Sequence, residues 1–356
     1  MSDKERMIKP EALEAYLAVL FEKAGMNKGD ALFSAECMVK TNLWGVDSHG
    51  VLRMPIYLQR VLAKVINPEP QITPVTEMDG PMALLDGDAG MGYVVGKAGM
   101  ELAIEKAKKF GIGMVLARNS NHYGAAALYA RQAVDAGMIG IATTNVIPNI
   151  GMKGNAKPST GNNPIAMAAP LEGDFPFVLD ISLSAVAGGK LLLAQKKGEK
   201  IPKDWAVTKE GKETDDPFAG FAGFLLPVGL HKGFGLSLFV DLITGVLSGG
   251  PYLHGLKSMY KHADDPSLTS HLFIVINPEV FLSKEAYMEK VTDWAAMVHA
   301  TEMVDPDSKQ VIPGEIEYMK EQDRRAHGIP VPSELIKDLA AYSEQLGVEM
   351  PKELCD

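Results

Sequence analysis

Short apolar runs alternate with amphipathic stretches over the middle of the chain, and this alternation constrains the fold more than any other feature. The runs have the length of strands and lie at residues 83–85, 113–117, 139–143, 164–169, 177–179 and 272–276. The amphipathic stretches have the length of helices and lie at residues 96–110, 125–136, 185–195 and 233–247. Strands that alternate with helices predict an α/β core.

The two ends of the chain predict helices without strands. Apolar residues recur with a helical rhythm in three early segments, at 10–24, 29–43 and 51–62. A group of prolines then marks a boundary between lobes, at positions 68, 70 and 74. A polar, turn-rich segment at 198–217 predicts a surface excursion. The chain closes with a predicted helix at 333–346, for which Ser333 is a suitable N-cap.

The composition favours metabolite chemistry over binding to nucleic acid or to a membrane. The 356 residues are 46% hydrophobic and 22% charged, as in globular proteins, and the formal net charge is -10. The longest basic stretch, at 196–200, is short and contains Glu199, so no nucleic-acid partner is expected. No uncharged apolar run is long enough to span a bilayer, so no membrane partner is expected either.

Cysteine usage and the first residues bear on the cellular compartment. Cys37 and Cys355 lie at opposite ends of the chain and form neither a disulfide framework nor a zinc-ligand cluster. No pair of histidines or carboxylates has the spacing of metal ligands, so no metal is expected. Residues 1–6 are polar, and no apolar stretch of the signal-peptide type follows them. We therefore expect a cytoplasmic protein.

A glycine-rich stretch follows the first predicted strand of the core. Residues 90–96 (GMGYVVG) lie between this strand and a predicted helix, which is the context of a phosphate-binding loop. However, the spacing is GxGxxxG rather than GxGxxG, and the next strand ends at Arg118 with no acid in the ribose-binding place. We interpret the stretch as a turn that enters a packed helix.

The segment GVDSHGVLR at 45–53 combines two groups that reduction of a 2-oxo acid requires. A forked arginine can fix the substrate carboxylate, and a histidine can protonate the carbonyl oxygen as it becomes an alkoxide. His49 and Arg53 are four residues apart, so they would share one face of a helix that began by His49. The alternative is that Asp47 or Ser48 caps the helix and that His49 is a polar surface residue.

A second histidine, His122, lies in the loop NSNHYG at 119–124, between a predicted strand and a predicted helix. Loops of this kind hold ligands in α/β proteins, so His122 could contact substrate or cofactor. The alternative is a loop histidine bonded to the backbone. The remaining histidines have no comparable context and are expected to be structural or exposed: His254, His262, His271, His299 and His327.

Two glycine-rich segments further along the chain are weaker candidates. In STGNNP at 159–164, Thr160 could bond a carboxylate, although turn formation alone explains the segment equally well. In GLHKGFG at 229–235, Lys232 lies near a predicted helix N-terminus, where it could face a phosphate. A surface lysine is the alternative for Lys232.

Taken together, these segments resemble the malate/L-lactate dehydrogenase family, which includes sulfolactate and ureidoglycolate dehydrogenases. The matching stretches follow the family's order over nearly the whole chain: GVDSHGVLRMPIYLQR, NSNHYGAAALYARQAVDAGMIGIATTN, STGNNPIAMAAP, FVLDISLSAVAGGK, LLPVGLHKGFGLSL and HLFIVINPEVF. The resemblance implies an α/β, non-Rossmann nicotinamide-binding fold with a mixed sheet and a helical lobe from both ends of the chain. It also implies an NAD(P)-dependent dehydrogenase of a small 2-hydroxy acid, of malate or L-lactate type. A homodimer with the site near the subunit interface is implied as well.

We accordingly expect three parts. Residues 1–75 form an N-terminal helical segment with the serine–histidine motif, and residues 76–310 form the core that binds cofactor and substrate. Residues 311–356 form a C-terminal segment that packs with the N-terminal helices.

The resemblance also implies roles for single residues. Ser48 and His49 match the family's catalytic serine–histidine pair, and His122 matches the acid/base of some members. Arg53 and Thr160 match substrate contacts. The cofactor-binding positions are His122, Tyr123, Gly124, Ala125, Asp180, Ile181, Ser182, His231, Lys232, Pro313, Gly314 and Glu315. The sequence chooses neither between His49 and His122 as proton donor nor between NAD and NADP.

One position bears on the class of substrate. Family members that reduce cyclic imines tend to carry an acid where this chain has Lys190, and a lysine suits an anionic hydroxy acid better than a cationic iminium. Lys190 could also be a charge on a helix surface. Ureidoglycolate and diketo sugar acids are alternative substrates of the same fold. A non-catalytic metabolite-binding relative is a further alternative, disfavoured because His49, Arg53 and His122 are all present.

Overall fold

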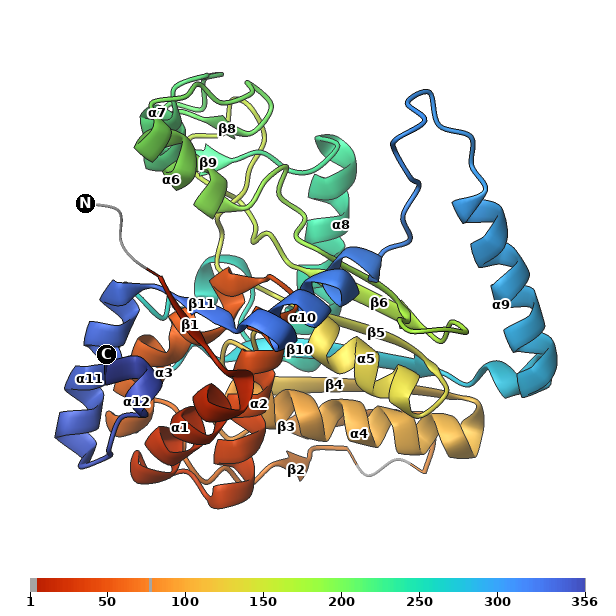
Figure 1. Ribbon diagram of the computed structural model, residues 1–356, viewed down its shortest axis with the longest axis horizontal. Helices are drawn as coiled ribbons and strands as arrows, with labels where there is room; N and C mark the ends of the chain where they lie inside the picture. The colour runs from red at the N-terminus through yellow and green to blue at the C-terminus, as the bar shows by residue number, and fades with distance from the viewer. Residues whose placement is uncertain (1–4, 77–78, 356) are drawn as a thin grey trace.

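A mixed sheet forms the centre of the computed structural model, which describes residues 5–76 and 79–355 (Figure 1). Within these residues the sheet has seven strands in the order β2-β3-β4-β10-β5-β6-β7. They are β2 (Thr73–Pro74), β3 (Met82–Asp86), β4 (Ile112–Ser120), β5 (Ile139–Thr144), β6 (Ile165–Ala169), β7 (Phe177–Ile181) and β10 (Thr269–Ile276). Among the described strands only β3 and β4 run parallel. The predicted mixed, non-Rossmann sheet is confirmed.

Helices α4 (Gly92–Phe110) and α5 (Ala127–Asp135) pack on this sheet, and two glycines let them approach closely. A Cβ at Gly96 would lie 2.3 Å from the Tyr129 ring of α5. A Cβ at Gly92 would lie 2.2 Å from the carbonyl oxygen of His122. The glycine-rich stretch is therefore the close-packed entry to α4, as interpreted from its spacing, and it lies directly against the predicted histidine loop.

The two ends of the chain form one helical lobe. Helix α1 (Pro10–Lys23) packs on α2 (Lys28–Leu43). Helix α11 (Ser333–Leu346) packs on α1 and on α3 (Met54–Leu62), and the short α12 (Lys352–Cys355) contacts β1. Strand β1 (Arg6–Ile8) pairs antiparallel with β11 (Ile329–Val331). The Tyr16 hydroxyl joins the two ends, 2.6 Å from the Ser343 hydroxyl. The predicted helical lobe is confirmed, whereas the boundaries at 75 and 310 stay predictions.

Two local predictions in this lobe are wrong. The helix expected at 51–62 begins only at Met54, because Asp47–His49 and Val51–Arg53 form two separate 3-10 turns around Gly50. Gly50 has non-helical backbone angles (φ -91, ψ -140), and a Cβ there would lie 2.0 Å from the Asn42 side chain. His49 and Arg53 therefore do not share a face of one continuous helix. In α11 the extended residue Pro332 is the N-cap, and Ser333 is already helical.

Two further segments leave the sheet. A small lobe at 185–226 contains α6 (Gly188–Lys197), α7 (Pro217–Ala222), β8 (Ala206–Val207) and β9 (Phe224–Leu225), with apolar clusters of its own. It includes the predicted excursion at 198–217. Helix α9 (Lys284–His299) stands apart from the sheet in Figure 1, and α10 (Glu315–His327) follows it. The sequence patterns missed α9 and α10, neither of which fully buries a side chain within the chain.

Helix α8 (His231–Asp241) and the π-helical turn after it (Leu242–Val246) contact β4, β5 and β10. Short 3-10 turns lie at Leu253–Gly255 and Pro278–Val280. No helix within the described residues has both the length and the apolar character that crossing a bilayer would require.

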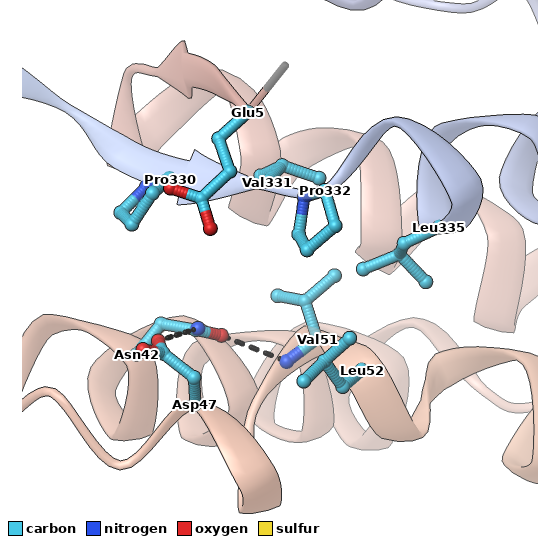
Figure 2. A pocket seen from close by; sticks show the side chains of 9 residues that line it. All are labelled: Glu5, Asn42, Asp47, Val51, Leu52, Pro330, Val331, Pro332 and Leu335. Carbon is cyan, nitrogen blue, oxygen red and sulfur yellow. Dashed lines mark hydrogen bonds between the residues drawn. The ribbon is translucent and has the colours of Figure 1, made fainter. Parts of the chain in front are cut away.

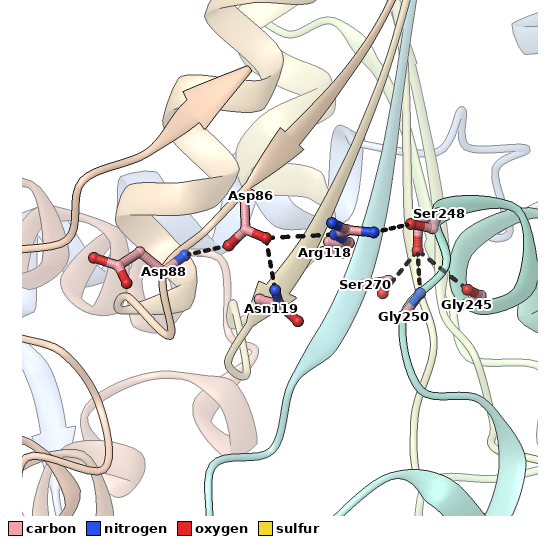
Figure 3. A network of polar contacts seen from close by, with 8 residues as sticks. All are labelled: Asp86, Asp88, Arg118, Asn119, Gly245, Ser248, Gly250 and Ser270. Atoms are coloured by element: carbon pink, nitrogen blue, oxygen red, sulfur yellow. Dashed lines mark hydrogen bonds and ion pairs between the residues drawn. The ribbon is translucent and has the colours of Figure 1, made fainter. Parts of the chain in front are cut away.

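A polar network fixes the loops that follow β3 and β4 (Figure 3). The Asp86 carboxylate accepts hydrogen bonds from Arg118 Nε at 3.4 Å and from Asn119 Nδ2 at 2.7 Å. Its other oxygen accepts from the backbone N–H of Asp88 at 3.0 Å. Arg118 also donates to the Ser248 carbonyl at 3.1 Å. Asn119 has a left-handed φ of 54, so this network sets the direction in which the histidine loop leaves β4.

Candidate active site

The two histidines singled out from the sequence face one another. The ring centroids of His49 and His122 are 5.6 Å apart and their planes differ by 25°. His49 comes from the 3-10 turn after α2, and His122 comes from the loop between β4 and α5. Both side chains are half-buried. The sequence predicted two separate candidates, and the fold places them in one site.

His122 is held through its Nδ1 atom. The Tyr57 hydroxyl lies 2.6 Å from this nitrogen, and the backbone N–H of Gly124 donates to it at 3.4 Å. Burial raises the pKa of Tyr57 to about 12, so the phenol keeps its proton and can donate. The Tyr57 hydroxyl can donate a hydrogen bond to Nδ1 or accept one from it, so it holds neutral His122 with the proton on either ring nitrogen. When the proton is on Nδ1 and is donated to the Tyr57 oxygen, the Nε2 lone pair is free, and Nε2 is the atom through which His122 can exchange a proton with a ligand.

The turn that carries His49 is anchored by ion pairing behind it. The Ser48 hydroxyl lies 2.9 Å from His49 Nδ1. The preceding Asp47 binds Arg324 of α10 through both carboxylate oxygens and accepts a bond from Asn42 at 2.6 Å. Asp47 is thus committed to Arg324 and caps no helix, whereas the role of His49 stays a prediction.

A cavity of about 140 Å³ separates this turn from the β1–β11 ribbon (Figure 2). Asn42, Asp47 and Val51 line one side of it, and Pro330, Val331, Pro332 and Leu335 line the other. Residues from both ends of the chain therefore support the segment from behind.

Arg53 lies beside the histidine pair with its terminal nitrogens uncommitted. Its Nε donates to the Ser48 carbonyl at 2.7 Å, and its guanidinium lies over the Tyr260 ring, 5.6 Å from the centroid. Within residues 5–76 and 79–355 no other hydrogen bond or ion pair of this guanidinium occurs. An arginine fork with two free terminal nitrogens fits a carboxylate.

Burial and positive neighbours keep both histidines neutral. Burial, followed by the charge of Arg53, lowers the pKa of His49 to about 4. Burial also lowers the pKa of His122 well below its ordinary value, and His49, Arg53 and His271 add to the effect. Two imidazoles that stay neutral near pH 7 can accept a proton, and a bound anion would help to hold that proton.

Several groups that support the site were missed by sequence reasoning. Tyr57 follows Arg53 by four residues, a helical spacing that could have revealed it. His271 of β10 is fully buried between the hydroxyls of Ser120 and Thr144, at 2.8 Å from each. Its ring stacks on Tyr123 at 4.4 Å. His271 is therefore structural, as expected, and the other four histidines without a motif are exposed.

Two of the predicted cofactor stretches meet beside the histidine loop. A cavity of about 220 Å³ is lined by Asp180 of β7 and by Pro313 and Gly314. The Asp180 carboxylate accepts the backbone N–H of Ala127 at 2.8 Å, at the start of α5. Although part of Asp180 reaches solvent, the protein around its carboxyl raises the pKa to about 6. Gly314 has a φ of 104 and could not carry a Cβ, which would lie 2.5 Å from the Pro176 carbonyl.

The remaining predicted contacts lie in varied surroundings. Tyr123 is 1% exposed, so its side chain faces the core and only its backbone could meet a ligand, whereas Gly124 and Ala125 continue the loop. Ile181 is 38% exposed, and the Ser182 hydroxyl accepts a bond from Asn162. Glu315 bonds His299 of α9.

Three predicted residues and Lys190 are not tied to the histidine pair by any contact within the described residues. Thr160 is fully buried, with its hydroxyl 3.2 Å from that of Ser237 in α8. His231 and Lys232 are exposed at the start of α8. Lys190 lies over the Trp205 ring in the small lobe. Their roles stay predictions.

The chain matches the model of the malate/L-lactate dehydrogenase family over residues 8–340. A malate dehydrogenase from Pyrococcus horikoshii is 38% identical over 350 residues, which cover 95% of each protein. The solved structure of sulfolactate dehydrogenase from Methanocaldococcus jannaschii has a TM-score of 0.90 at 36% identity, and the match covers 97% of this chain and 98% of that one.

Two further relatives have names that specify a cofactor. The ureidoglycolate dehydrogenase (NAD+) of Escherichia coli K12 is 34% identical over 90% of each protein. The (2R)-3-sulfolactate dehydrogenase (NADP+) of Chromohalobacter salexigens is 30% identical over 95% of this chain and 98% of its own.

Matches of this extent concern the complete fold rather than a shared motif. They agree with the local chemistry, since a neutral histidine pair beside a free arginine fork suits a dehydrogenase of 2-hydroxy acids. The chain belongs to the malate/L-lactate dehydrogenase family. The family, fold and enzyme class expected from the sequence are therefore confirmed. In the described part of the chain, no cluster of three or more histidines, cysteines or carboxylates is arranged to hold a metal ion.

Proposed function

We propose that this dehydrogenase interconverts malate and oxaloacetate, or a closely similar 2-hydroxy and 2-oxo acid pair such as L-lactate and pyruvate, with NAD or NADP. The observation that carries the proposal is the contact of the His49 and His122 rings beside the uncommitted fork of Arg53. Two pyrococcal relatives named malate dehydrogenase, each 38% identical, support malate as the first choice.

Arg53 binds the substrate carboxylate through its terminal nitrogens, because its Nε already donates to Ser48. His122 exchanges the proton on the substrate oxygen through Nε2, because Nδ1 faces Tyr57 and Gly124. When His122 is protonated, its Nδ1–H donates to the Tyr57 oxygen, since a hydroxyl can either donate or accept. Tyr57 therefore holds the ring in both protonation states. His49 stacks on His122.

The residues present fit a nicotinamide cofactor. The cavity beside Asp180 joins apolar walls to two carboxylates, those of Asp180 and Glu317, and it borders the start of α5, five residues beyond His122. At about 220 Å³ it suits a part of a dinucleotide, such as its ribose or its base, rather than the whole. Asp180, Pro313 and Gly314 would hold that part, and the bound nicotinamide would supply or accept a hydride.

Absorbance of reduced nicotinamide tests this function directly. NADH and NADPH are each offered with oxaloacetate, pyruvate, other 2-oxo acids and a cyclic imine, and ureidoglycolate is tested in the oxidative direction. We expect oxaloacetate to give the highest kcat/KM. A preference for the imine or for ureidoglycolate would contradict the proposed substrate, and no turnover with the whole panel would favour a metabolite-binding protein. We place the reaction in the cytoplasm, which the unpaired Cys37 and Cys355 support.

A homodimer is also part of the proposal, and the outward face of α8 supports it. Apart from Val240, the buried residues of this segment are small or polar: Gly233, Ser237, Asp241, Thr244 and Gly245. Large apolar side chains point outward and are 40–57% exposed: Leu236, Leu238, Phe239, Leu242, Val246 and Leu247. This arrangement is the reverse of a surface helix and is typical of a face that another protein covers. We propose that a second copy of the chain covers it.

Light scattering should give twice the chain mass of 38.4 kDa. The double change Phe239→Lys and Leu242→Lys is expected to give the single-chain mass, because two charges cannot be buried unpaired in an apolar interface. Leu32→Lys on α2, where Leu32 is 40% exposed, is the matched control and should leave the mass doubled. A single-chain mass for the unmodified protein would contradict the dimer.

A further inference from the structure

Arg60 of α3 has the largest fully buried side chain among the described residues, and the proposed chemistry does not use it. Its guanidinium donates to three carbonyls, of His262 (3.3 Å), Ala263 (3.0 Å) and Asp265 (2.9 Å). It also donates at 3.3 Å to Ser267 Oγ and to Asn121 Oδ1, next to His122. A buried guanidinium is costly unless its donors are bonded, so these contacts tie α3 firmly to the segment at 262–267.

The segment continues back to Lys257, and both of its ends are fixed. Ser258 is 8% exposed, and its hydroxyl accepts the backbone N–H groups of Tyr260 at 3.3 Å and Lys261 at 3.2 Å. Lys257 forms an ion pair with Asp265 at 3.6 Å across the segment. We call residues 257–267 the Arg60-anchored loop.

This loop brings one aromatic ring to the substrate arginine. Tyr260 is 56% exposed, and its ring lies against the Arg53 guanidinium at 5.6 Å. The Arg53 Nε is held by Ser48, so the ring contact and this bond together restrict rotation of the fork. A guanidinium held in this way presents its terminal nitrogens in a fixed plane, which favours bidentate pairing with a planar carboxylate.

We infer that Tyr260 is a positioning residue for Arg53 and that the Arg60-anchored loop exists at this site to hold it there. The inference rests on the proposed role of Arg53 as the carboxylate ligand. Tyr260 acts through its ring face, and the loop couples the carboxylate-binding end of the site to the histidine loop through Arg60 and Asn121. The ligand it serves is a planar carboxylate of a small acid.

The test compares Tyr260→Ala with Tyr260→Phe. Tyr260→Ala is expected to raise KM for the 2-oxo acid by about 2- to 5-fold with little change in kcat, which is the size of an exposed cation–π contact. Tyr260→Phe retains the ring and should stay near the unmodified protein. The control is Phe110→Ala, which removes a ring from beside Lys109 at the far end of α4 and should change nothing.

A second readout does not depend on turnover. Oxalate, a planar dianion without a reducible carbonyl, is titrated calorimetrically in the presence of NAD+ or NADP+, with Arg53→Met as the reference for a lost carboxylate site. Tyr260→Ala should weaken oxalate binding by the same factor as KM. If the unmodified enzyme binds oxalate through Arg53 but reduces no 2-oxo acid, the proposed function fails. The inference is then tested by the oxalate affinities of Tyr260→Ala and Tyr260→Phe alone. Three results would each overturn the inference. They are no binding of oxalate by the unmodified enzyme, an unchanged oxalate affinity and KM in Tyr260→Ala, and a loss in Tyr260→Phe as large as that in Tyr260→Ala.

Arg60→Met tests the anchor. It keeps the volume of the side chain and removes the donors, so the loop should open to trypsin at Lys257 and Lys261 and KM should rise as in Tyr260→Ala. If Arg60→Met does not fold, Ser258→Ala is used instead, because it removes only the turn at the start of the loop. The same two effects are expected for it, cleavage by trypsin and a higher KM. Proteolysis and KM that both match the unmodified protein would refute the anchoring role.

Discussion

Asparagine in place of His122 is expected to lower kcat in both directions by about 10²- to 10⁴-fold, the usual contribution of a general acid–base group. Asparagine still offers an oxygen to the Tyr57 hydroxyl and nearly fills the space, but it cannot carry the proton. Steady-state assays of 2-oxo acid reduction and 2-hydroxy acid oxidation measure the loss. The control is His327→Asn, a change at an exposed histidine of α10 that should be silent.

His49→Asn separates the roles of the paired histidines. It removes the stacking partner of His122 but not the proposed proton carrier, so its loss of kcat should be smaller. A larger loss for His49→Asn than for His122→Asn would reverse the assignment.

His122 is expected to give different pH profiles in the two directions. The pKa of His122 lies well below its ordinary value. His122 is therefore already neutral near pH 6.5, and its small imidazolium fraction falls further as the pH rises. The kcat/KM for hydroxy-acid oxidation should therefore show no His122 limb near pH 6.5. The kcat/KM for oxo-acid reduction, measured with saturating reduced cofactor, should fall with rising pH over the same range.

Methionine in place of Arg53 is expected to lower kcat/KM for 2-oxo acids by about 10²- to 10³-fold, mostly through KM, because a hydrogen-bonded charge pair with the substrate is lost. Methionine keeps the apolar stem against Tyr260 and removes the fork. Arg131→Met is a matched control, since Arg131 also lies over an aromatic ring, that of Trp44 at 4.7 Å.

Affinity for a carboxylate separates this result from a misfolded variant. Arg53→Met should lose binding of oxalate while its melting temperature stays near that of Arg131→Met. An unchanged KM for oxaloacetate would remove Arg53 from the substrate site.

The strands and most helices were predictable because their signals are local. The apolar runs at 113–117 and 272–276 became β4 and β10, where Val115, Ala117 and Phe273 are completely buried. Helices α9 and α10 were not predicted, since neither fully buries a side chain in the isolated chain. A hydrophobic pattern in the sequence predicts a helix only where one face of that helix is buried within the same chain.

The site was predictable in its residues but not in its connections. His49, Arg53 and His122 each stand in a glycine-flanked segment, and their order along the chain carries the family resemblance. The helix expected through His49 and Arg53 was wrong, because the close contact between Gly50 and Asn42 breaks it into two turns. The contact of Asn42 with a residue nine positions later is tertiary, and no periodicity reports it.

The sequence by itself determined the α/β class, the family and the two histidines of interest, because these follow from local patterns and from motifs kept in order. Only the tertiary structure decided that His49 and His122 stack, that Tyr57 holds Nδ1 of His122, and that Tyr260 covers Arg53. The reason is physical. Each of these contacts joins segments that are distant in the chain, and each depends on directions set by packing, such as the exit of the histidine loop from β4.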